Sequence, residues 1–134
     1  MSRRNSSLGF LGRFGRSMDL QRLDAALRAV DLHPSLVPEG AKLTIVNMMK
    51  DAFPRQEPPE PAYAPVAALF AYCLVGPDLF GEANGDELLA SAEARVEKAL
   101  EAGEGMDADL ILLALHAKLV SPVVVEKFDL TIED

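Results

Sequence analysis

Few side chains in this 134-residue sequence have the type and spacing for chemistry, and Asp109 with His116 is the main pair. Seven residues turn an α-helix through nearly two full turns, so both side chains point the same way, about 10 Å apart along the axis. They cannot touch each other, but they could flank a shared small ligand. The candidate ligand pocket therefore comprises Asp109 and His116, with His33 and Tyr72 as further members. A narrow polar seam facing solvent explains the same pair without a ligand, and we favour that interpretation.

Metal and nucleophile chemistry have less support. The sequence contains no HExxH or CxxC motif and no two histidines four residues apart, so we predict no metal and no cofactor. Cys73 lies in an apolar stretch, where a buried cysteine acts as a small hydrophobe and is inert. His33 precedes Pro34 at an expected helix end, where the helix dipole favours a cation. We predict no catalytic residue.

Charge is divided unevenly along the chain. The first sixteen residues hold four arginines and three glycines but no acidic residue. The whole chain carries −8, so subtracting the four positive charges of this segment leaves −12 on residues 17–134. We therefore divide the chain into a basic Gly/Arg-rich arm, residues 1–16, and a single helical domain, residues 17–134. The glycines lower helix stability, so we expect a mobile or extended arm.

The arm interleaves Phe10 and Phe14 with Arg13 and Arg16. Aromatic and arginine side chains together make good anchors at protein interfaces. Basic residues also suit an anionic membrane surface, so a membrane contact through the arm alone stays open. The alternative without a partner is a disordered tail that keeps the protein soluble. Nucleic acid is disfavoured as a partner, because a chain with a pI near 4.7 repels polyphosphate.

Glu93, Glu97 and Glu101 follow one another at intervals of four, along one side of an expected helix. A solvated face is the ordinary interpretation of such a row. The row also offers an acidic surface to a basic partner, and the arm of a second copy is one candidate. The nearly apolar stretches Ala62–Val75 and Leu110–Val120 look generous for one small core. The leading hypothesis is therefore a non-enzymatic protein-interaction module that self-associates, and a small enzyme or ligand binder is the alternative.

The elements that position these residues are predicted to be helices, because apolar residues recur at a helical period. We expect an all-α fold, a compact bundle of five or six helices, whose central helix spans about 64–75 and is apolar all round. Gly81 and Asn84-Gly85 indicate irregular chain after that helix. Residues 123–132 favour a strand by their three valines and a short helix by Ser121 and Pro122, and we choose the helix. The other expected helices span about 17–32, 38–53, 86–102 and 108–120.

The sequence also bears on location. The longest nearly apolar run has 14 residues with a proline inside, whereas a membrane-spanning helix needs roughly 20. The first residues do not follow the pattern of a secretion signal. A single cysteine cannot form an internal disulfide, which fits a reducing compartment. We therefore expect a cytoplasmic protein.

Overall fold

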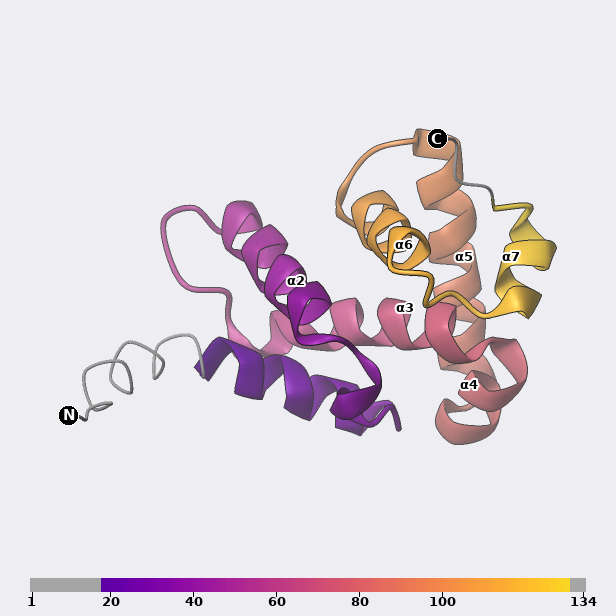
Figure 1. The fold of residues 1–134 in the computed structure, drawn as a ribbon, viewed down its shortest axis with the longest axis horizontal. Coiled ribbons are helices and arrows are strands. Elements are labelled where there is room, and N and C mark those ends of the chain that lie inside the picture. Colours follow the sequence, from indigo (N-terminus) through magenta and orange to yellow (C-terminus); the bar gives the residue numbers. More distant parts are fainter. Residues whose placement is uncertain (1–17, 131–134) are drawn as a thin grey trace.

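The computed structural model describes residues 18–130, and these residues form an all-helical fold (Figure 1). The basic arm lies outside the described residues, as do residue 17 and residues 131–134. Between residues 18 and 130 the structure has seven α-helices, two single-turn 3-10 helices and no strand. The α-helices are residues 18–29, α2 (Glu39–Ala52), α3 (Tyr63–Val75), α4 (Pro77–Asn84), α5 (Asp86–Ala102), α6 (Met106–His116) and α7 (Pro122–Phe128). The 3-10 helices are Pro34–Leu36 and Glu60–Ala62.

The predicted all-α class is confirmed, but the described chain has seven helices where five or six were expected. The extra element is α4, which the sequence indicated as irregular chain. Gly76, at φ 89°, ends α3 and lets Pro77 begin a new helix directly. Gly85, at φ 95°, then separates α4 from α5. In the ambiguous segment 123–132, the residues up to Phe128 belong to the helix α7, and the Ser121 hydroxyl accepts the backbone N–H of Val123. Residues 131 and 132 lie outside the described residues.

α3 is the most thoroughly buried helix described, with nine of its 13 residues in the core. It contacts α4, α5, α6 and the turn Glu60–Ala62. Figure 1 shows residues 18–29 and α2 beside its first half and the later helices around its second half. Residues 66–73 are all buried and span more than two turns, which explains why this part of the helix has no polar face. No helix between residues 18 and 130 is long and apolar enough to cross a membrane.

Three helices end on a residue other than glycine in the left-handed conformation. These residues are Asp31 (φ 65°), Lys118 (φ 60°) and Asp129 (φ 53°). Each is followed by a leucine whose backbone N–H donates to the carbonyl five residues back, at 2.9 Å, which is the Schellman arrangement. The leucines after the two aspartates are buried, so packing holds these helix ends in place. The left-handed conformation costs a residue with a Cβ roughly 1–2 kcal/mol.

Replacing Lys118 with glycine is therefore expected to stabilise the protein. Glycine removes the cost of the positive φ, although it also gives the unfolded chain more freedom, so we expect a net gain of about 0.5–1 kcal/mol. Urea unfolding followed by circular dichroism measures the change. Lys118→Ala is the control, because it removes the same charge but keeps the Cβ. Equal stability of the two variants would show that the backbone at this position is not strained.

Candidate functional site

Tyr72 and Glu93, which the sequence assigned to two different surfaces, meet at one point. The buried Tyr72 of α3 donates its hydroxyl to Glu93 Oε2 of α5 at 2.8 Å. Lys127 Nζ of α7 lies 3.3 Å from the same oxygen. The Tyr72 ring also meets the rings of Phe80 and Phe128 edge-on, with centroids 5.8 and 6.5 Å apart. Glu93 therefore ties α3, α5 and α7 together.

The hydrogen bond between Tyr72 and Glu93 has a structural role. Burial, followed by the hydrogen bond to Glu93 and the charge of that residue, raises the pKa of Tyr72 well above its ordinary value of 10.0. The phenol stays protonated at neutral pH and keeps donating to the carboxylate. A phenol with so high a pKa is a poor proton donor to a substrate, since efficient acid catalysis wants a pKa near the working pH.

The predicted acidic face is divided by this contact. The side chain of Glu93 is 25% exposed and engaged with Tyr72 and Lys127, whereas Glu97 and Glu101 are exposed. Neither Glu97 nor Glu101 forms an ion pair with another residue of the described chain. An open recess of about 450 Å³ adjoins this face, lined by Glu93, Glu97, Lys127 and Phe128. The predicted partners on the arm, Phe10, Arg13, Phe14 and Arg16, lie outside the described residues.

The candidate ligand residues His33, Tyr72, Asp109 and His116 are not gathered into one pocket. Asp109 and His116 are exposed near opposite ends of α6. His33 caps the following turn: its Nδ1 accepts the backbone N–H of Ser35 at 3.1 Å and lies 2.8 Å from the Ser35 hydroxyl. Tyr72 is buried against Glu93, as above. No group of three or more histidine, cysteine or acidic side chains between residues 18 and 130 is placed to hold a metal ion.

Sequence reasoning missed a polar contact around Asp19, which lies in the first turn of the helix formed by residues 18–29. Asp19 is 3% exposed and is the one charged residue buried in the described part of the chain. Its carboxylate accepts the Tyr63 hydroxyl at 3.2 Å and pairs with Lys50 Nζ at 3.2 Å. Burial and the neighbouring Asp19 charge raise the pKa of Tyr63. The partners are 44 and 31 positions away, so no local pattern could have indicated them.

A second missed contact joins α5 to α6. Arg95 donates to both carboxylate oxygens of Asp107, at 3.1 and 2.8 Å, and also to the carbonyl of Pro65 at 2.8 Å. The carbonyl belongs to the first turn of α3. A bidentate arginine–carboxylate pair is among the stronger polar contacts in proteins. Arg95 thus holds three helices together, as Glu93 does on the other side of α5.

Comparison of the chain with protein-family models, with curated proteins and with solved structures finds no match.

Stability is expected to fall at alkaline pH because of the two tyrosines. A raised pKa means that the folded state holds the phenol proton more tightly than the unfolded state, whose tyrosines titrate near pH 10. The stabilisation is complete below about pH 10 and is lost as the pH rises further. The free energy of unfolding, measured in urea between pH 8 and pH 11.5, should decline. It should decline less in Tyr72→Phe, and an unchanged slope in that variant would contradict the assignment.

Cys73 is expected to be unreactive in the folded protein. Burial raises the pKa of its thiol to about 12, so little thiolate exists at neutral pH. Ellman's reagent at pH 8 should modify the native protein at least roughly a hundredfold more slowly than the protein in urea, because reaction must await unfolding. Rapid modification of the native protein would show that the thiol is accessible.

Proposed function

We propose that this chain is a non-enzymatic helical interaction module that self-associates, with the basic arm of one copy bound to the acidic face of α5 in another. The observation that carries the proposal is that Glu97 and Glu101 are exposed and form no ion pair with another residue of the described fold. Four arginines and no acidic residue in the arm supply the complementary charge. Glu93 does not bind the arm directly in this proposal, because it already contacts Tyr72 and Lys127. Its contribution is to hold in place the helix that carries Glu97 and Glu101.

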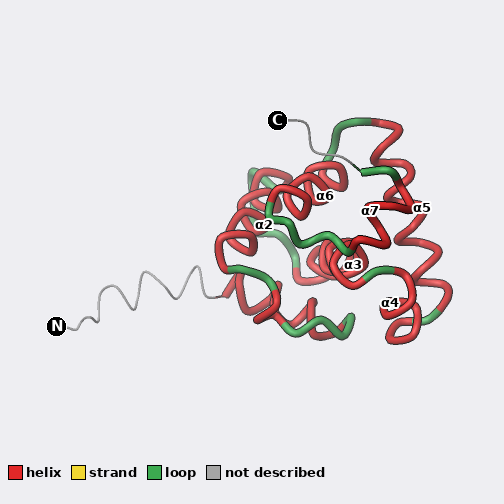
Figure 2. The backbone as a smooth tube through the Cα atoms, turned by 45° about the vertical axis from the view of Figure 1, so that its right-hand side comes forward, coloured by secondary structure: helices red, strands yellow, loops and turns green. Residues whose placement is uncertain are grey.

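The arrangement of the helices supports a contact between copies. The described chain begins on one side of the fold, and α5 lies on the other side in both views (Figures 1 and 2). An arm attached at residue 18 therefore starts away from the acidic face of its own chain. A contact between two different surfaces is heterologous, and it builds either a closed ring or an open chain of copies. In this proposal residues 17–134 act as one cytoplasmic domain organised about α3.

The sequence suggested more apolar residues than one small core needs, but these residues do not support the proposed self-association. The Ala62–Val75 stretch is taken up by the core, where α3 buries most of its side chains. In the Leu110–Val120 stretch the exposed large side chain is Leu112, at 49%. The support therefore comes from charge rather than from an apolar surface.

Charge reversal tests the proposed contact directly. Glu97→Lys with Glu101→Lys should weaken self-association by roughly tenfold or more at low salt, because two exposed charge pairs of modest strength become repulsive. Arg13→Glu with Arg16→Glu should do the same. A mixture of the two double variants should associate again, since each restores the attraction for the other. Sedimentation velocity at low and high salt over a range of protein concentrations measures all three.

Glu39→Lys with Asp51→Lys on α2 is the matched control, because both residues are exposed and the change in net charge is identical. This control should associate like the natural sequence. A monomer at every concentration, or association that ignores all of these charges, would overturn the proposal. Binding of the natural chain to anionic vesicles that Arg13→Glu with Arg16→Glu abolishes, without any self-association, would assign the arm to a membrane surface instead.

A further inference from the structure

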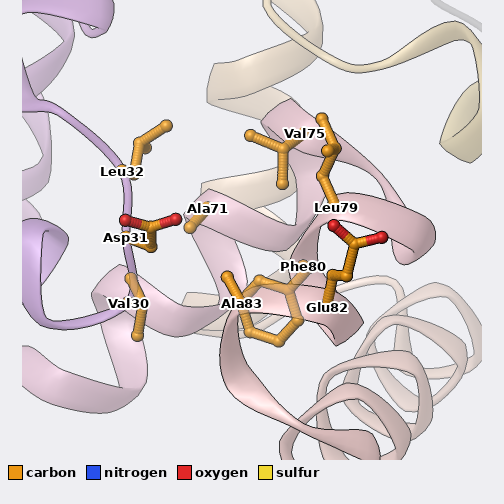
Figure 3. A pocket seen from close by; sticks show the side chains of 9 residues that line it. All are labelled: Val30, Asp31, Leu32, Ala71, Val75, Leu79, Phe80, Glu82 and Ala83. Carbon is orange, nitrogen blue, oxygen red and sulfur yellow. The ribbon is translucent and has the colours of Figure 1, made fainter.

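A cavity of about 230 Å³ lies between the end of the first helix, the second half of α3 and α4 (Figure 3). Seven of its nine lining side chains are apolar, and Ala71 and Phe80 are buried at its inner side. The two exceptions are the carboxylates of Asp31 and Glu82. An apolar hollow with a few placed polar groups is the usual form of a small-molecule site.

The two carboxylates stand on opposite sides of this cavity. Figure 3 shows Asp31, from the chain after the first helix, facing the hollow from one side and Glu82, from α4, on the other. Both residues are exposed, and neither forms an ion pair with any other residue in the 18–130 range. Arg28 shares an adjacent recess with Asp31 but is not paired with it. The cavity therefore presents two carboxylates that form no ion pair with the described residues and are separated by an apolar surface.

Both sides of the cavity are fixed by the fold. The Schellman arrangement holds the backbone at Asp31, and the next residue, Leu32, is 2% exposed in the core. Asn84 of α4 donates from its side chain to the carbonyl of Val30 at 3.0 Å. This hydrogen bond joins the helix that carries Glu82 to the turn that carries Asp31. A site held in place before binding loses less conformational entropy when a ligand arrives.

We propose that this cavity binds a small aliphatic diamine, with one ammonium group beside Asp31, the other beside Glu82 and the methylene chain against Ala71 and Phe80. The volume of about 230 Å³ leaves room for a short methylene chain with a nitrogen at each end, and diamines with four or five carbons have six or seven non-hydrogen atoms. A monoamine leaves one carboxylate without a partner, and a dicarboxylate of the same length meets two like charges.

Nuclear magnetic resonance titration of the full chain tests the proposal, with 1,4-diaminobutane and 1,5-diaminopentane as probes. Both should bind saturably, with the largest backbone amide shifts around Asp31, Glu82 and Ala83. n-Pentylamine should bind about tenfold more weakly, because it has one ammonium group instead of two. Glutarate should not bind. Higher salt should weaken diamine binding, since the charges are exposed.

Asp31→Asn and Glu82→Gln should each lower diamine affinity by about five- to tenfold. Asparagine accepts the left-handed conformation, so the helix end is retained. Asp129→Asn is the matched control, because it makes the same change at another left-handed helix end that does not line the cavity, and its affinity should be unchanged. Ala83→Leu should abolish binding by filling the cavity from an exposed position, with the melting temperature preserved.

Equal binding of the diamine and the monoamine would overturn the proposal, as would retention of full affinity in both carboxylate variants. Amide shifts elsewhere in the protein, or diamine affinity unaffected by Ala83→Leu, would place binding outside the cavity. Self-association of the variants, measured in parallel by sedimentation, keeps this result separate from the role of the arm.

Discussion

The unbroken burial of residues 66–73 in α3 is the constraint on which the rest of the structure depends. A helix surrounded by core must satisfy every polar group it carries, because an unpaired buried hydroxyl costs free energy. α3 carries two tyrosines, and each donates to a carboxylate from another helix, Tyr63 to Asp19 and Tyr72 to Glu93. Its proline-containing first turn receives Arg95 at the Pro65 carbonyl. The polar groups of α3 therefore determine which charged side chains of the surrounding helices face the core.

Acidic residues around α3 and along α5 consequently differ in their surroundings. Asp19, Glu93 and Asp107 are tied to the interior by a tyrosine, a lysine or an arginine. Glu97 and Glu101 face solvent on the same helix as Glu93, one and two turns further along. The carboxylates of the first group stabilise the packing, and their charges are already paired within the protein. The second group gives α5 an anionic surface that another molecule can reach.

The helical period in the sequence predicted the fold class and the long amphipathic helix α5 because burial of one face leaves a local pattern. It did not predict α4, where Gly81 and the Asn84-Gly85 pair mask an eight-residue helix. Nor could it predict that Tyr72 and Glu93 meet, since the tyrosine was placed in a pocket and the glutamate on a partner surface. Periodicity assigns a side chain to a face of its own helix, whereas contacts between helices depend on tertiary packing.

The cavity at Asp31 is a consequence of the same packing. The first helix ends where its chain turns inward at Leu32, and α4 begins directly after α3, so the two segments approach α3 from different directions. Ala71, a small side chain on α3, leaves space between them, and the Asn84 hydrogen bond fixes their separation. Charged residues at this opening cost little, because they remain hydrated. Two carboxylates can therefore face a single cavity at this opening without destabilising the core.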